Sequence, residues 1–348
     1  MTLSFPDESR LIEGDARYSA RLARPEDSEE LVRLFTRVFP RELQNGLALV
    51  KQVWEWKYGE PYGTSQSAVM SLDPFGQLVA HIGGIPTRTL VFGEARWTIQ
   101  SVDNMVDANH RYRTTGIPIF SELLGAWWER CVLPFGAVTA WGFPTQLNHR
   151  VGARAAEYEL IEHMRFLSRA ASDGGVGRPS DACLTTVQRG TPGDVDALWD
   201  RCAPELGIAL VRDKAYLDWR YQRHPSGVHR FVTCRDRRDG SLRGLAVVRP
   251  WSESRDLFAI VDWLVPQDDG EACSALIAAV ESEAARHGAR TIGTWFPAPN
   301  PWARRFELMG FWSGRTRRPY VVRFATADLD LATMRAHLYA TPGDADVN

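Results

Sequence analysis

Two halves of this chain repeat one pattern of residues, and this duplication constrains the fold more than any other feature. Residues 54–58 (WEWKY) return as 217–221 (LDWRY), and 101–106 (SVDNMV) return as 260–265 (IVDWLV). Other matched segments keep the same order and nearly the same offset, among them 141–144 (WGFP) and 294–297 (TWFP). A repeat of this length indicates a duplicated domain rather than a solenoid of short units. The length of 348 residues agrees, since it suits about two domains.

Changes in amino-acid composition along the chain indicate where the domain boundaries lie. The segment 170–180 is rich in Gly, Ser and Asp, as linkers are. The last residues follow a short helix-like run from Leu329, and we expect a frayed end there, with folding back over the active site as the alternative. The expected parts are an N-terminal tail over 1–17, a first domain over 18–168, a linker over 169–181, a second domain over 182–326 and a C-terminal tail over 327–348.

Overall composition excludes several classes of protein. Hydrophobic residues make up 44% of the chain and charged residues 24%, which is ordinary for a globular protein. A net charge of −2 argues against broad electrostatic binding to nucleic acid or to a membrane surface. No apolar run approaches the roughly 18 residues that span a bilayer. The five cysteines lack the spacing of metal ligands or disulfides, so we expect a cytoplasmic protein without a bound metal.

Strand and helix patterns alternate in the first half, and the second half repeats the succession. Helical spacing of apolar residues follows 25–29, and a turn sequence at 73–76 separates two alternating runs. The expected strands are 18–24, 66–72, 78–89, 95–106, 137–142 and a closing strand at 158–167, with helices over 31–38, 117–131 and 147–155.

The segment between the strand 95–106 and the following helix has the features of an anion site. A strand, a tight turn and a helix N-terminus direct several backbone N–H groups toward one point, where the helix dipole adds about half a positive charge. Gly116 allows the main chain to approach a ligand closely, and Arg113 can add a charged hydrogen bond. These residues therefore predict a loop that holds a pyrophosphate mainly on its backbone.

The order of residues in this loop, Arg113-x-x-Gly116-x-Pro118 after Tyr112, resembles the Arg/Gln-x-x-Gly-x-Gly/Ala signature of the GCN5-related N-acetyltransferases. In that family the loop binds the pyrophosphate of acetyl-coenzyme A. Pro118 departs from the usual last Gly or Ala; proline suits the first turn of a helix but removes one donor to the phosphate. The resemblance covers about 18–324 and includes 304–311 (RRFELMGF), which is similar to the family's final helix and Gly-Phe turn.

This resemblance implies an α/β (α+β) chain of two tandem domains of the same family, each with a mixed, mostly antiparallel central sheet flanked by helices. It implies acetyl-coenzyme A as co-substrate and direct attack of an amine on the thioester. The strand before the loop would line the pantetheine arm, and the backbone of Met105 and Val106 would polarise the thioester oxygen. The residues expected to contact the coenzyme are Met105, Val106, Arg113, Thr114, Thr115, Gly116, Ile117, Pro118 and Asn148.

The second half lacks the anion loop. At the matching place it has 265–272 (VPQDDGEA), so three carboxylates lie at the start of the next helix. Negative charge suits a helix N-terminus but would repel a pyrophosphate. We therefore expect only the first domain to bind coenzyme A, and the second to be a degenerate copy that builds the acceptor pocket or stiffens the enzyme.

Candidates for acid and base chemistry are few, although the attacking amine must lose a proton. Asp103, just before the expected thioester position, is the first candidate, and His81 is the second. Both also have structural interpretations: Asp262 matches Asp103 in the half without the loop, and His81 could be a packed or surface histidine. Asn148 could instead cap a helix. Ala153 stands where the family often has a tyrosine acid, and the boxes at 54–58 and 217–221 are expected to be core or interface elements.

Three function classes remain open at this point. The first is an acyl-coenzyme A-dependent N-acyltransferase, most simply one that transfers acetyl to an amine of a small molecule or peptide. The second is an aminoacyl-tRNA-dependent peptide ligase of the same duplicated fold, which should carry a broader basic surface and an inserted helical arm. The third is a non-catalytic module that senses acyl-coenzyme A. For the first class we expect a monomer or homodimer without membrane or nucleic-acid partners.

Overall fold

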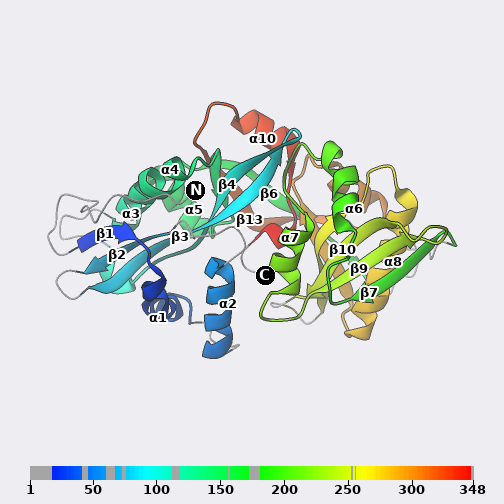
Figure 1. The fold of residues 1–348 in the computed structure, drawn as a ribbon, viewed down its shortest axis with the longest axis horizontal. Helices are drawn as coiled ribbons and strands as arrows, with labels where there is room; N and C mark the ends of the chain where they lie inside the picture. The colour runs from blue at the N-terminus through cyan, green and yellow to red at the C-terminus, as the bar shows by residue number, and fades with distance from the viewer. Residues whose placement is uncertain are drawn as a thin grey trace. The chain divides into compact units, whose positions relative to one another are not determined.

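The computed structural model describes residues 18–40, 46–59, 67–72, 76–111, 118–155, 157–171, 181–251, 254 and 256–345. These residues form two compact units (Figure 1). The first unit takes in residues up to Thr87, then Trp97–Glu159 and Val321–Asp328, and the second takes in Arg88–Arg96, Leu160–Tyr320 and the residues from Leu329 onward. Each unit is therefore built from segments that are distant in sequence.

A mixed sheet forms the centre of the first unit. The pairs β1–β2, β2–β3 and β5–β13 are antiparallel, while β4 and β5 run parallel. Its strands follow the order β1 (Tyr18–Leu22), β2 (Ala68–Leu72), β3 (Gln77–Val91), β4 (Glu94–Val106), β5 (Thr139–Gly142) and the end of β13 (Trp312–Phe324).

Helices of the first unit cover this sheet through apolar side chains. Leu123, Leu124 and Trp127 pack with Val79 and Ile99 of the sheet in one core cluster. Leu31, Leu34 and Trp54 pack with Val69 and Met105 in another. The helices are η1 (Pro25–Asp27), α1 (Ser28–Val38), α2 (Leu47–Gly59), η3 (Ala108–His110), α3 (Ile119–Trp127), the π-helical η4 (Trp128–Val132), α4 (Leu133–Phe135) and α5 (Gln146–Ala155).

The second unit has a sheet of the same kind. The pairs β7–β9, β9–β10, β10–β11 and β6–β12 are antiparallel, and β11–β12 is parallel. Its strands follow the order β13, β6 (Glu159–Ala170), β12 (Thr291–Phe296), β11 (Leu257–Leu264), β10 (Leu242–Pro250), β9 (Arg230–Asp236) and β7 (Cys183–Gln188).

Helices and short strands complete the second unit. Helix α8 packs on β7, β9 and β10, and α6 packs against β10 and β11. The short strand β8 (Ile208–Leu210) pairs with β14 (Leu338–Tyr339) and with the end of β3. The helices are α6 (Val195–Cys202), η5 (Ala203–Glu205), α7 (Lys214–Leu217), the π-helical η6 (Asp218–Gln222), α8 (Gly270–Arg286), α9 (Pro301–Leu308), α10 (Leu331–His337) and η7 (Pro342–Asp344).

Element types follow the sequence patterns closely, and the α/β class with two similar sheets is confirmed. The five cysteines are free and buried. Within the described part of the chain, no helix is both long and apolar enough to cross a membrane.

The closing strands and the C-terminal tail differ from expectation. The closing strand of the first copy, β6, lies almost wholly in the second unit, where it pairs with β12, and the end of β13 pairs with β5 in the first unit. Because the two copies carry equivalent closing strands, each sheet can accept the strand of the other copy. The prediction of a frayed end is wrong, because residues 338–345 are buried in the second unit. Their polar groups are hydrogen-bonded there: Asp344 accepts from Arg212 and from the N–H of Thr341.

Candidate functional site

The candidate site in the first unit begins where strands β4 and β5 diverge. Among the described residues the two strands pair only at Ile99–Ala140 and Gln100–Trp141. Beyond that point β4 continues to Val106, whereas β5 ends at Gly142. The backbone groups of β4 after Gln100 therefore lack β5 as a ladder partner, and they offer N–H and C=O groups to a ligand on that side.

Asp103, within this stretch of β4, has a strained backbone. Its φ of +48° lies in the left-handed region, which costs a residue other than glycine about 1–2 kcal/mol. Its matched residue in the second unit, Asp262, has no positive φ. The strain is thus specific to the first unit, and strained residues held by their surroundings gather at functional sites.

Side chains from α2 hold Asp103 in place. Lys57 Nζ donates to both carboxylate oxygens at 3.0 Å, and the Tyr58 hydroxyl donates to Oδ2 at 2.7 Å. The side chains of Lys57 and Asp103 are only 8% and 6% exposed. In the second half Tyr221, the counterpart of Tyr58, likewise donates to Asp262 at 2.8 Å, so in both copies the box supplies the tyrosine partner of the aspartate.

His81 on β3 completes the cluster. Its ring is 1% exposed and packs at 5.4 Å from the Trp54 ring and 5.9 Å from the Tyr58 ring, centroid to centroid. Nδ1 lies 3.0 Å from the carbonyl oxygen of Asp103. Because a carbonyl only accepts, this bond places the ring proton on Nδ1 and leaves the lone pair on Nε2. That Nε2 atom is buried and has no hydrogen-bond partner among the described residues, and burial lowers the pKa of His81 below its ordinary value.

The start of α3 is where the sequence places the anion loop. The N–H of Ile119 donates to the carbonyl of Arg111 at 3.2 Å, so these two residues are in direct contact at the start of the helix. Pro118 is exposed and precedes the helix with φ −67°. The other expected loop residues lie outside the described residues: Arg113, Thr114, Thr115, Gly116 and Ile117.

Three further expected contacts are placed by the structure. Met105 and Val106 lie on β4 beyond its pairing with β5, and the Met105 side chain is buried in the core. Asn148 lies in the first turn of α5, where its N–H is 3.3 Å from the Thr145 hydroxyl oxygen. The structure therefore brings Asp103 and His81 into direct contact and puts Met105 and Val106 on the same strand as Asp103.

The second unit differs at the matching helix start. Asp269 caps α8 by accepting the N–H of Ala272 at 2.9 Å. Arg243 pairs with Asp269 at 2.7 Å and with Glu271 at 3.0 Å. A helix start that already has a carboxylate on its N–H group is poorly suited to a phosphate. Across the described residues, no group of three or more His, Cys, Asp or Glu side chains is arranged to hold a metal.

Sequence reasoning did not find the roles of Lys57 and Tyr58, although the repeat contained the signal. The sequence of each copy contains a basic residue, a tyrosine and an aspartate at matching positions: Lys57, Tyr58 and Asp103 in one, Arg220, Tyr221 and Asp262 in the other. A basic and an acidic position retained together predict an ion pair. In the second copy the tyrosine contact is as the repeat predicts, but the ion-pair partner of Asp262 is Arg212, which no repeat identifies.

Comparison with known proteins gives a match in structure and none in sequence. No family model and no curated protein matches the chain. A conserved protein of unknown function from Enterococcus faecalis, named as a probable N-acyltransferase, is similar with a TM-score of 0.64 and 14% identity, over 88% of this chain and 72% of that one. A tandem GNAT protein from the clavulanic acid biosynthesis pathway is similar with a TM-score of 0.56 and 13% identity, over 90% of this chain and 100% of that one.

Saccharomyces cerevisiae N-myristoyltransferase with bound myristoyl-CoA is a third similar structure, with a TM-score of 0.57 and 11% identity, over 90% of this chain and 80% of that one. At such identities the likeness establishes the fold, and function has to be argued from the site. The chain therefore has the duplicated fold of the GCN5-related N-acetyltransferases.

Proposed function

We propose that the protein is an acyl-coenzyme A-dependent N-acyltransferase whose coenzyme site lies in the first unit, and that it transfers acetyl from acetyl-coenzyme A to an amine of a small molecule or peptide. The observation that carries the proposal is the free edge of β4 after Gln100. Beyond the end of this edge lies Arg111, whose carbonyl accepts the N–H of Ile119 at the start of α3. An extended arm with a terminal pyrophosphate suits a strand edge followed by a helix N-terminus.

In transfer by direct attack, the protein must stabilise the developing negative charge on the thioester oxygen and accept the proton of the amine. The amine nitrogen bonds to the thioester carbonyl carbon, the carbon–sulfur bond breaks, and the electron pair leaves on sulfur. A backbone N–H of β4, at Met105 or Val106, would stabilise the negative charge that develops on the carbonyl oxygen, an effect typically worth about 3–4 kcal/mol. The amine proton must pass to a base.

Within the cluster, His81 and Asp103 have different proposed roles. The Asp103 carboxylate already accepts from Lys57 and Tyr58, so it is poorly placed to take a further proton. His81 Nε2 has a lone pair, and within the described part of the chain no group hydrogen-bonds to it. We therefore propose His81 as the proton acceptor, directly or through one water, and Asp103 as a positioning residue that fixes the His81 tautomer through its carbonyl and shapes β4 through its side chain.

Coenzyme binding is tested by Gly116→Glu. A glutamate in the loop would place a carboxylate where the pyrophosphate is proposed to lie, so calorimetry with acetyl-coenzyme A should show affinity reduced at least 100-fold. The matched control is Gly270→Glu at the start of α8, where an added side chain meets open space and binding should be unchanged. Wild-type affinity in Gly116→Glu would contradict the loop assignment.

A non-catalytic acyl-coenzyme A sensor is the second candidate, and the burial of the cluster favours it. His81 is 1% exposed, and Asp103 is held in a buried ion pair. The two functions separate in an assay for free thiol, with saturating acetyl-coenzyme A and a panel of amines. Release of thiol that depends on an amine supports the transferase; binding without release under every amine supports the sensor.

A further inference from the structure

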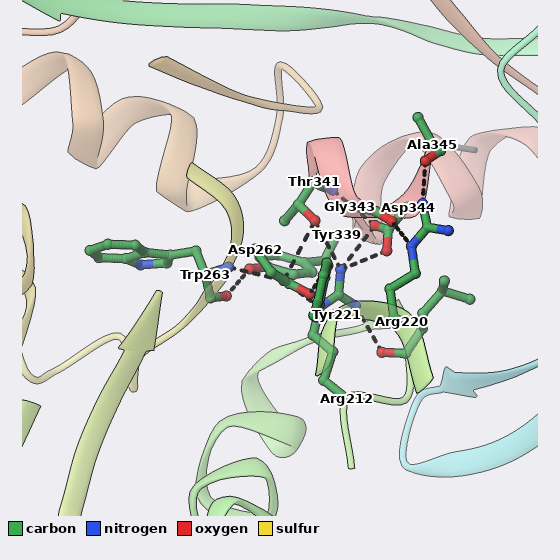
Figure 2. A network of polar contacts seen from close by, with 11 residues as sticks. Arg212, Arg220, Tyr221, Asp262, Trp263, Tyr339, Thr341, Gly343, Asp344 and Ala345 are labelled. Carbon is green, nitrogen blue, oxygen red and sulfur yellow. Dashed lines mark hydrogen bonds and ion pairs between the residues drawn. The ribbon is translucent and has the colours of Figure 1, made fainter. Parts of the chain in front are cut away.

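The C-terminal segment of the chain is built into the second unit. Strand β14 pairs with β8, and η7 packs against β11 and β12. Figure 2 shows the polar network that receives this segment, with Arg212 between Asp262 of β11 and Asp344 of η7. A chain end with this many buried partners is a fixed part of the unit.

Arg212 is the centre of the network. Its side chain is 0% exposed, and its Nε donates to Asp262 at 2.8 Å while Nη2 donates to Asp344 at 2.9 Å. Nη2 also lies 3.3 Å from the Thr341 hydroxyl. Burial alone would lower the pKa of Arg212, but the carboxylates of Asp262 and Asp344 raise it above its ordinary value. The buried guanidinium thus depends on a carboxylate that only the C-terminal segment supplies.

Backbone contacts bind the same segment from the other side. Arg220, the counterpart of Lys57, donates to the carbonyls of Gly343 and Ala345. Gly343 lies so close to the Tyr221 hydroxyl and to the Val261 carbonyl that a methyl group there would overlap both. The packing around Gly343 therefore leaves no room for a larger residue at this position.

The C-terminal segment lies where strands β11 and β12 are no longer paired with each other. Strands β11 and β12 pair at Leu257–Thr291, Phe258–Ile292 and Ala259–Gly293, and both continue past that point unpaired with each other. Their counterparts β4 and β5 part in the same way. In the second unit η7 packs against both strands, and Gly343 lies at Val261, beyond the last pair.

We propose that the C-terminal segment 338–345 is an internal ligand of the second unit: it occupies the place between β11 and β12 that corresponds to the place of the acyl thioester arm between β4 and β5 in the first unit. The second unit is then closed to acyl-coenzyme A on two counts, by this occupant and by the acidic start of α8. The equivalence to the place of the thioester arm rests on the proposed function, whereas the position of the segment between β11 and β12 rests on its own contacts.

Gly343→Ala in the full-length protein tests the proposal. The added methyl group should displace η7, so hydrogen exchange of the amides in Leu257–Leu264 and in 338–345 should become at least tenfold faster. Gly193→Ala is the matched control, since its side chain meets open space on an exposed turn of the same unit, and it should exchange as the wild type does. Unchanged exchange in Gly343→Ala would overturn the proposal.

Rescue in trans separates an internal ligand from an ordinary element of the fold. A synthetic peptide of residues 338–345, added in excess to the Gly343→Ala protein, should restore slow exchange in β11. The same peptide with Asp344→Ala should not, because it lacks the carboxylate that pairs with Arg212. Failure of the wild-type peptide to protect β11 would contradict the ligand interpretation.

A milder variant covers the case in which Gly343→Ala does not fold. Asp344→Asn has nearly the same shape but leaves Arg212 with one carboxylate, and it should speed exchange of 338–345 at least threefold without unfolding the unit. Exchange at the wild-type rate in Asp344→Asn would show that the ion pair does not hold the segment.

Discussion

At the scale of single residues, the two matched aspartates, Asp103 and Asp262, have different ion-pair partners. Asp103 pairs with Lys57 on a strand that is strained at this residue, whereas Asp262 pairs with Arg212 on a strand without a positive φ. The first arrangement leaves the neighbouring edge of β4 free of β5, and the second binds the chain's own end through Arg212. Each aspartate thus holds a buried ion pair in its unit, and we propose that function depends on what its partners position.

Asp103→Ala tests the structural role of this residue. It leaves the Lys57 ammonium buried without its carboxylate, so the free energy of unfolding should fall by about 3–5 kcal/mol in urea titrations. Asp256→Ala removes a carboxylate from an exposed pair with Arg290 and should change stability by about 1 kcal/mol or less. An equal effect of the two substitutions would contradict the buried ion pair.

His81→Gln tests the proposed proton acceptor. Its kcat should fall about 100-fold or more, as expected on loss of a general base. Because burial lowers the pKa of His81, wild-type kcat/KM should be flat above pH 6.5 and should decline only as the pH falls through that lowered value; the decline should be absent in the variant.

His229→Gln is the matched control for this substitution. His229 is also buried, packs at 5.2 Å from the ring of Tyr221, and has an unpartnered Nδ1 atom. Burial lowers its pKa to about 2, so it stays neutral over the assay range and should leave the pH profile unchanged. A profile that changes equally in both variants would argue against a specific role of His81.

At the scale of elements, the divergence of β4 and β5 depends on a close approach at Gly142. A Cβ atom there would lie 2.9 Å from the carbonyl oxygen of Ser101, closer than packed atoms tolerate. Gly142→Ala should therefore shift β5 against β4 at the point where they part, and weaken coenzyme binding about tenfold, or about 1.4 kcal/mol, by calorimetry. Gly125→Ala in α3 meets open space and should bind as the wild type does; equal affinities in all three proteins would contradict the proposed path of the ligand.

Most elements could be predicted from the sequence because their periodicity is local. The expected strand at 95–106 is β4 (Glu94–Val106), and the expected helix at 147–155 is α5 (Gln146–Ala155). The exchange of closing strands could not be predicted, because two equivalent strands in a duplicated chain have the same pattern and only tertiary pairing chooses between them. The burial of Pro342–Asp344 was hidden for a similar reason: Pro, Gly and Asp have the composition of a loose terminus.

The candidate site was predictable only in part. The repeat singled out Asp103 and its second copy, and the strand before the loop was recognisable by its apolar run. The tautomer of His81 and the partners of the Asp103 carboxylate depend on contacts between residues more than 20 positions apart in the chain. Sequence patterns of period two or 3.6 carry no information on such contacts.

At the scale of the whole molecule, duplication has produced two sheets of one kind for which we propose different occupants. Among the described residues, the first unit has a stretch of β4 without β5 as a partner, and the second has an acidic helix start and a buried segment over residues 338–345. This asymmetry supports our proposal of a substrate site in one copy and a stable scaffold in the other. It also makes the number of coenzyme molecules bound by each chain a decisive quantity.

The central claim is that coenzyme binds the first unit alone. It is tested most directly by a calorimetric titration of the wild-type protein with coenzyme A, combined with hydrogen–deuterium exchange measured on the free and the coenzyme-bound protein. We predict one equivalent bound per chain, with protection of amides in Glu94–Val106 and none in Leu257–Leu264. Two equivalents, or protection confined to Leu257–Leu264, would contradict the account.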